Sequence, residues 1–193
     1  HIIPWEEYIY INKIGEAFKD KFKILKIGRP IFYYQGIDEL PQDYSLFIDA
    51  TKDLYENNDA VVLMGHGTSH PANSVYGCLQ SVFEDEGYEN VFIGTVEGYP
   101  NFDTVIKRLK RKNITEVTVA PLMVVAGDHA RNDMASDEEE SWKSMLEAEG
   151  IKVNVHMKGL GENEKFNELY INRIEDLIND RYIGVGQTKK GHK

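Results

Sequence analysis

Short apolar runs alternate along this chain with longer segments whose apolar residues recur every three or four positions. Continuous apolar runs are typical of strands buried in a parallel sheet, and the wider spacing is typical of amphipathic helices. Because helical segments separate most of the runs, the sequence predicts an α/β fold built on parallel strands. The runs that predict strands cover residues 22–27, 61–64, 91–96, 117–125 and 153–157.

The helical segments begin at residues that favour helix starts. Asn101 and Asn163 each precede a periodic segment, and asparagine favours the N-cap position. Ser136 or Asp137 is expected to cap a further helix that carries Trp142. The other predicted helices cover residues 4–18, 43–55 and 73–85. The first of them is expected to turn a stripe of four apolar residues inward, namely Ile9, Ile11, Ile14 and Phe18.

Composition narrows the class of protein. The 193 residues include 22 basic and 32 acidic side chains, which gives a net charge of −10. Binding to nucleic-acid phosphates requires a basic face, so we expect no nucleic-acid partner. No apolar run approaches the roughly 20 residues of a membrane span, so we expect no membrane partner. Cys78 is the single cysteine, which excludes an internal disulfide and a four-cysteine zinc site and suits a reducing compartment.

Unusual polar residues follow three of the predicted strands. His66 lies in a Gly-His-Gly turn, Glu97 follows the strand at 91–96, and His129 follows the run at 117–125. Ligands bind outside the carboxyl ends of the strands in open α/β sheets, so these side chains converge if the three strands are neighbours. Two imidazoles and a carboxylate suit a divalent ion such as Co²⁺, Ni²⁺, Fe²⁺ or Zn²⁺. Gly65 and Gly67 lack a Cβ, which would let a flat ligand approach the backbone.

Each of these residues also has an interpretation without a ligand. A single histidine beside a strand end is commonly a hydrogen-bonded turn residue, and Glu97 alone would be an ordinary loop carboxylate. His70 precedes a proline and is expected to lie at a helix entry, and His156 is expected within a strand. The glycine-rich turn has neither the lysine of a phosphate-binding loop nor the spacing of a dinucleotide fingerprint.

Three segments carry a family resemblance. They are Met-Gly-His-Gly at 64–67, Val-Glu-Gly-Tyr-Pro at 96–100, and the long stretch at 121–137 that contains Ala-Gly-Asp-His-Ala. With them, the chain resembles the anaerobic sirohydrochlorin cobaltochelatases, the class II chelatases of cobalamin biosynthesis. The resemblance is strong over residues 60–178 and weaker over residues 2–55.

The resemblance implies a chelatase-like fold of two similar parallel-sheet lobes flanked by helices, with the tetrapyrrole bound between them. Residues 1–57 would form part of the N-terminal lobe, 58–162 the C-terminal lobe with the ligand loops, 163–180 a helix that packs back on the first lobe, and 181–193 a flexible tail. The chain opens on His1-Ile2-Ile3 without a methionine. Against the family pattern, roughly 60–80 residues of the first lobe are expected to be missing, at about 30 per βαβ unit.

The resemblance also implies an activity, the insertion of a divalent metal into sirohydrochlorin without ATP. The family's metal ligands fall on His66, Glu97 and His129, and His66 is also the expected proton acceptor. Gly65, Gly67 and Thr68 are expected to contact the substrate. Co²⁺ is the expected substrate metal, which Ni²⁺, Fe²⁺ or Zn²⁺ could replace, and no permanently bound cofactor is expected. A homo-oligomer and a cytoplasmic location fit the same interpretation.

Two further hypotheses stay open at this point. One is a non-catalytic protein that binds a metal or a haem-like tetrapyrrole in the same cleft. The other is a metal-dependent hydrolase, although the Gly-x-Ser-x-Gly turn of one hydrolase class is absent. For a polycarboxylate substrate, local cations must offset the acidic charge of the protein, and Arg29 and Arg131 are candidates.

Overall fold

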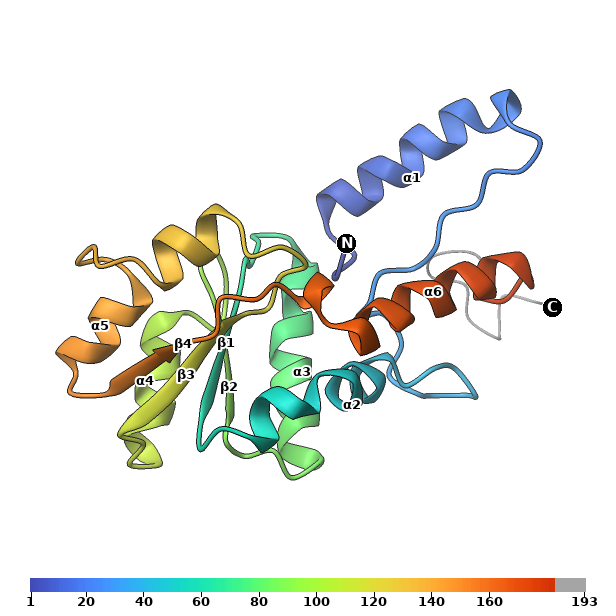
Figure 1. Ribbon diagram of the computed structural model, residues 1–193. Helices are drawn as coiled ribbons and strands as arrows, with labels where there is room; N and C mark the ends of the chain where they lie inside the picture. Colours follow the sequence, from blue (N-terminus) through green and yellow to red (C-terminus); the bar gives the residue numbers. More distant parts are fainter. Residues whose placement is uncertain (183–193) are drawn as a thin grey trace.

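A four-stranded parallel sheet forms the centre of the protein. The computed structural model describes residues 1–182, and its strands are ordered β2-β1-β3-β4 (Figure 1). β1 lies between β2 and β3 and pairs with both in parallel. Because the three strands run in the same direction, their carboxyl ends lie at one edge of the sheet. The strands are β1 (Val61–Gly65), β2 (Val91–Thr95), β3 (Glu116–Pro121) and β4 (Lys152–Val155).

Helices cover both faces of this sheet. Alternate strand residues enter two separate cores, so that Leu63 packs with α2, α3 and α6, whereas Met64 packs with α4 and α5. The predicted α/β class with parallel strands is therefore confirmed. The helices are α1 (Glu6–Phe18), α2 (Asp43–Glu56), α3 (Ser74–Asp85), α4 (Phe102–Arg111), α5 (Trp142–Ala148) and α6 (Glu164–Ile178).

Two predicted helix caps are confirmed and one is wrong. The Asn101 side chain accepts a hydrogen bond from the Thr104 N–H, and the Asn163 side chain accepts one from the Phe166 N–H. Neither Ser136 nor Asp137 caps α5. That helix begins later because Ser141 is its cap, and a π-helical turn, Ala130–Met134, precedes it.

The strand predicted at residues 22–27 does not form. Isolated strands leave their backbone groups unpaired, and no neighbouring strand is present for this segment among residues 1–182. Ile24 is instead 76% exposed. Residues 1–57 contribute α1, α2 and a single bridge between Gln35 and Gln42, so the second sheet expected for the first lobe is not seen in the described part of the chain. β3 also ends at Pro121, earlier than predicted.

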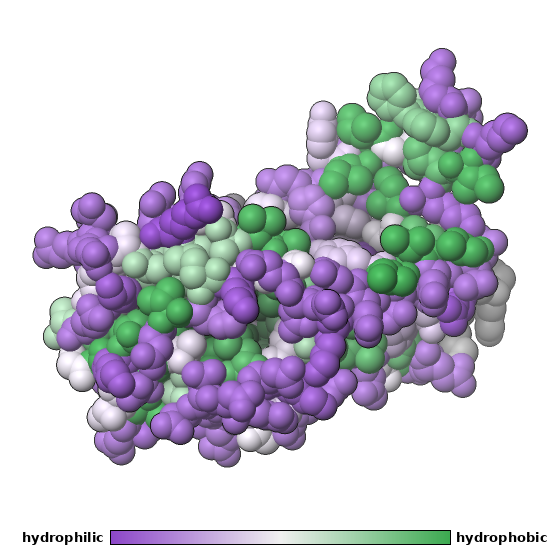
Figure 2. Space-filling view, viewed as in Figure 1, coloured by the Kyte–Doolittle hydropathy of each residue, from purple (hydrophilic) through white to green (hydrophobic). Residues whose placement is uncertain are grey.

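Helix α1 lies away from the sheet, and its predicted inward stripe is wrong. Figure 1 shows α1 standing off the body of the molecule, and its buried residues are Tyr8 and Gly15. Apolar side chains gather over α1 and α6 in Figure 2. The predicted stripe is 40–51% exposed, and comprises Ile9, Ile11, Ile14 and Phe18.

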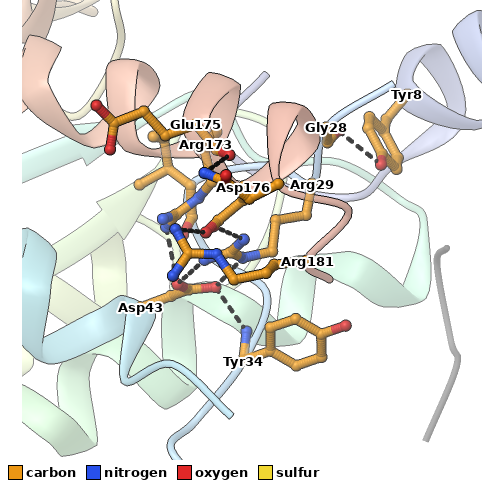
Figure 3. A network of polar contacts seen from close by, with 11 residues as sticks. Tyr8, Gly28, Arg29, Tyr34, Asp43, Arg173, Glu175, Asp176 and Arg181 are labelled. Atoms are coloured by element: carbon orange, nitrogen blue, oxygen red, sulfur yellow. Dashed lines mark hydrogen bonds and ion pairs between the residues drawn. The ribbon is translucent and has the colours of Figure 1, made fainter. Parts of the chain in front are cut away.

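A buried network of ion pairs joins α6 to α2 (Figure 3). Asp43 lies at the first turn of α2 and accepts hydrogen bonds from Arg29 and Arg173. Asp176 accepts a further bond from Arg29 at 2.6 Å. The guanidinium of Arg29 is therefore buried and paired with two aspartates, and the prediction that it could offset substrate charge is wrong. Phe47 and Phe166 continue the same contact between the helices edge to face.

Two further expectations concern the C-terminal tail and membrane-spanning helices. Most of the flexible tail predicted at 181–193 lies outside the described residues, because those residues end at 182. None of the helices in the described part of the chain is long and apolar enough to cross a membrane.

Candidate metal centre

Three predicted ligands meet at the carboxyl edge of the sheet. His66 directly follows β1, Glu97 follows β2, and His129 lies in the segment after β3. Backbone pairing continues past the strands, since the Glu97 N–H donates to the His66 carbonyl at 2.8 Å. The Leu122 N–H similarly donates to the Met64 carbonyl at 2.8 Å. These bonds hold the three segments side by side, which is why ligands far apart in sequence converge.

The donor atoms are close enough for one ion. One ligand atom from each of His66, Glu97 and His129 lies within 4.8 Å of the others. Donors bound to one ion at about 2.1 Å lie at most about 4.2 Å apart, so only small side-chain movements are needed. The two imidazole rings are edge to face with centroids 4.6 Å apart, and the Glu97 carboxylate lies beside the His66 ring, with Oε2 3.9 Å from Nδ1.

The cluster is open to solvent. The side chains of His66 and His129 are 33% and 36% exposed, and that of Glu97 is 59% exposed. Structural metal sites are closed by four protein ligands, whereas catalytic sites leave a position free. An exposed set of three donors therefore suits an ion that arrives and leaves.

The two imidazoles are oriented by different partners. His66 Nδ1 is 2.8 Å from the Gly67 carbonyl, which can only accept a hydrogen bond, so Nδ1 carries the proton and Nε2 presents its lone pair. The indole of Trp5 packs edge-on against the same ring at 5.5 Å. His129 Nδ1 contacts the Asp133 carboxylate instead, at 2.5 Å.

The glycines beside His66 make room for protein atoms. Gly67 has a φ of +83°, and a Cβ there would lie 2.6 Å from the Gly98 nitrogen. A Cβ on Gly65 would lie 2.5 Å from the Tyr76 ring. Packing inside the protein thus explains both glycines. The predicted contact of Gly65, Gly67 and Thr68 with a substrate stays a prediction.

A mostly apolar cavity of about 210 Å³ opens beside His66. It lies between the N-terminal segment and the loop that follows β3. A cavity of this kind suits the face of a flat apolar ring next to the donors. Its lining includes Ile2, Trp5, Tyr76, Leu122 and Met123.

The other histidines lie apart from the cluster. His70 caps the turn Pro71–Asn73, where its Nδ1 accepts from the Ala72 N–H, as expected for a helix entry. His156 lies just after β4 rather than within it, and burial lowers its pKa. Sequence reasoning missed Asp133 and Trp5. The spacing of Asp133, four residues after His129, was the available signal for the first.

A parallel α/β sheet therefore carries an open His-Glu-His cluster at its carboxyl edge, with three donors placed where one divalent ion could be held and where active sites of this architecture typically lie. The model of the cobalt chelatase (CbiK) family matches residues 1–179, and the chain belongs to this family. The family resemblance stated from the sequence is therefore confirmed.

Two relatives show the extent of the similarity. The chain is 34% identical over 182 residues to a sirohydrochlorin cobaltochelatase of Salmonella typhimurium, covering 93% of this chain and 66% of the relative. It is 32% identical over 180 residues to the sirohydrochlorin cobaltochelatase CbiKC of Nitratidesulfovibrio vulgaris, covering 92% and 63%. The chain thus spans slightly under two thirds of the length of these relatives.

A solved structure supports the fold. A crystal structure from Marinobacter aquaeolei VT8, described as a CbiX protein of cobalamin (vitamin B12) biosynthesis, matches with a TM-score of 0.50 at 23% identity. The match covers 63% of this chain and 95% of that one. At this identity, it supports the chelatase-like α/β architecture alone.

Proposed function

We propose that this chain inserts Co²⁺ into sirohydrochlorin without ATP, as a lyase of the early cobalt-insertion route to cobalamin. The observation that carries the proposal is the open cluster of His66, Glu97 and His129 beside an apolar cavity, in a chain of the cobalt chelatase family. Both compared relatives are named for this activity.

The cluster would deliver the metal as a substrate. Three exposed donors bind an ion less tightly than a closed site of four ligands does. The weaker binding favours transfer of the ion to the tetrapyrrole. Imidazole and carboxylate ligands also suit Ni²⁺, Fe²⁺ and Zn²⁺, so these ions could replace Co²⁺, and such ligands bind Ni²⁺ more tightly than Co²⁺ or Fe²⁺. Cobalt use would then follow from the supply of the metal and from geometry.

His66 would also accept a proton. Metal insertion releases two pyrrole N–H protons, and a neutral imidazole within reach can take one of them. The Gly67 carbonyl holds Nδ1 of His66, which leaves Nε2 as the reactive atom. One nitrogen cannot bind metal and proton together, so the two roles must alternate or water must carry the proton.

The ring would lie over the apolar cavity, with Trp5 against one side of His66. Gly65, Gly67 and Thr68 would border it through their backbone, because their side-chain positions face the protein. Arg131 is exposed near His129 and would offset the negative charge of the substrate. The absence of a permanent cofactor, a homo-oligomeric state and a cytoplasmic location belong to the same proposal.

A second candidate function is non-catalytic binding of a metal or a tetrapyrrole at the same cluster. The observation that favours it is the donor cluster itself, because three ligand atoms within 4.8 Å of one another can hold an ion without any reaction following. Such a binder would use the same donors and show no turnover.

The test replaces one ligand and compares it with a remote histidine. Sirohydrochlorin and Co²⁺ are mixed with the chain, and insertion is followed by the change in tetrapyrrole absorbance. His129→Ala should abolish the protein-dependent rate because it removes a donor, whereas His156→Gln should retain it. A full rate in His129→Ala would contradict the assignment of the site.

A further inference from the structure

The carboxylate of Asp133 contacts the imidazole of His129 at Nδ1. Asp133 Oδ2 lies 2.5 Å from His129 Nδ1, and the two residues belong to the same turn of the chain. A carboxylate accepts hydrogen bonds when ionised, so it selects the tautomer of His129 whose Nδ1 carries the proton. That tautomer presents the lone pair of Nε2.

The local backbone makes this contact a fixed feature. The π-helical turn Ala130–Met134 buries Ala130 and Met134 completely in the core shared with α4 and α5. His129 directly precedes Ala130, and Asp133 directly precedes Met134, so these two residues are also four positions apart. Their side chains lie on one side of the turn and are 36% and 42% exposed. Because the buried pair anchors the turn, the exposed pair keeps its spacing.

We propose that Asp133 is a positioning residue that fixes the ring of His129 with Nε2 free for the incoming metal; this inference rests on the proposed role of His129 as a ligand. Asp133 is not one of the three residues whose donor atoms lie within reach of one ion. Carboxylate partners of metal-binding histidines fix ring orientation and raise ligand basicity, and their loss typically costs about 10–100-fold in metal affinity.

The two histidines are consequently unequal ligands. His66 is held by a neutral carbonyl, that of Gly67, whereas His129 is held by a charged carboxylate. The charged partner strengthens the donor character of His129 more than the carbonyl strengthens that of His66. His129 is therefore expected to hold the ion more firmly than His66 does.

The experiment measures metal binding and tautomer without a tetrapyrrole. Co²⁺ is titrated into the chain and its visible absorption is recorded, while nitrogen-15 NMR of the metal-free chain reports the tautomer of His129. Asp133→Ala should weaken Co²⁺ binding about 10–100-fold and let the His129 proton distribute over both nitrogens. Asp133→Asn keeps the shape and an acceptor oxygen, so it should keep the tautomer and weaken binding less.

The matched control is Asp137→Asn, four residues further along, where the carboxylate is 93% exposed and pairs with Lys143. It should bind Co²⁺ as the wild type does. Asp133→Ala with wild-type affinity and an unchanged tautomer would overturn the inference, whether or not the chain inserts cobalt. If the wild type binds Co²⁺ with this dependence on Asp133 but shows no turnover, the inference stands and the proposed chelatase activity fails. If the wild type binds no Co²⁺, both fail.

Discussion

The imidazole rings of His66 and His129 meet edge to face at 90°, with centroids 4.6 Å apart. One follows β1 and the other follows β3, and the parallel pairing of these adjacent strands brings their carboxyl ends together. A fixed pair of imidazoles at the point where parallel strands end is the geometric basis of the proposed metal delivery.

Replacing His66 should impair the chemical step as well as metal binding. His66→Ala removes a ligand and the proposed proton acceptor, so the insertion rate should stay roughly 10²–10⁴-fold low even at saturating Co²⁺. Steady-state insertion rates over a Co²⁺ series measure this. Recovery of the wild-type rate at high Co²⁺ would leave His66 with a binding role only.

The loop that carries His66 should tolerate no side chain at Gly67. Gly67→Ala would place a Cβ 2.6 Å from the Gly98 backbone at a φ of +83°, and should cost about 1–3 kcal/mol of unfolding free energy. Gly77→Ala is the matched control, because a Cβ at this position in the first turn of α3 meets nothing within 4 Å. Urea denaturation compares the two variants, and equal stability would contradict the packing described for this loop.

The contact between α2 and α6 should depend on Asp43. Its carboxylate is fully buried and accepts hydrogen bonds from Arg29, Arg173 and the Tyr34 N–H. Asp43→Ala leaves two buried guanidinium groups undercompensated, which should destabilise the fold by about 3–5 kcal/mol. Asp49→Ala, on the exposed face of the same helix, should leave the unfolding transition almost unchanged. A small effect of Asp43→Ala in denaturation would show that the network contributes little.

Stability should fall in mildly acidic solution partly through His156. Burial, and then the nearby Lys158, lower the pKa of this imidazole, while Glu162 opposes the shift. The unfolded chain binds the proton at a pKa near 6.5 and the folded chain only at lower pH, so the unfolding free energy decreases as the pH falls below about 6.5 and levels off below the folded pKa. Denaturation between pH 7.5 and 5 should show a shallower pH dependence in His156→Gln. Identical slopes in variant and wild type would contradict this contribution.

The sequence was most informative where the sheet itself is concerned. The buried run at 61–64 and the Gly-His-Gly turn were enough to predict β1 and the place of His66. The convergence of His66, Glu97 and His129 was predicted on the condition that their strands are neighbours, and the strand order meets that condition. Asn163 marked the start of α6 because capping is a local interaction.

Features that depend on distant partners could not be predicted. Residues 22–27 have the composition of a strand but no neighbour to pair with in the described chain. Arg29 was a candidate to offset substrate charge, and its burial could not be predicted because its two aspartate partners lie far along the chain, on α2 and α6. The apolar residues of α1 recur at helical spacing. This spacing predicts that they share one face of the helix, but it does not show whether that face is buried.

The most direct test of the central claim is the number of cobalt ions inserted per chain. The wild-type chain is mixed with Co²⁺ and an excess of sirohydrochlorin at pH 7.5, and the absorbance of the metallated product is followed against a protein-free reaction. A chelatase converts many equivalents of sirohydrochlorin per chain, and His129→Ala should remove this turnover. A spectral change that stops at one equivalent per chain would contradict the proposed activity and identify a binding protein.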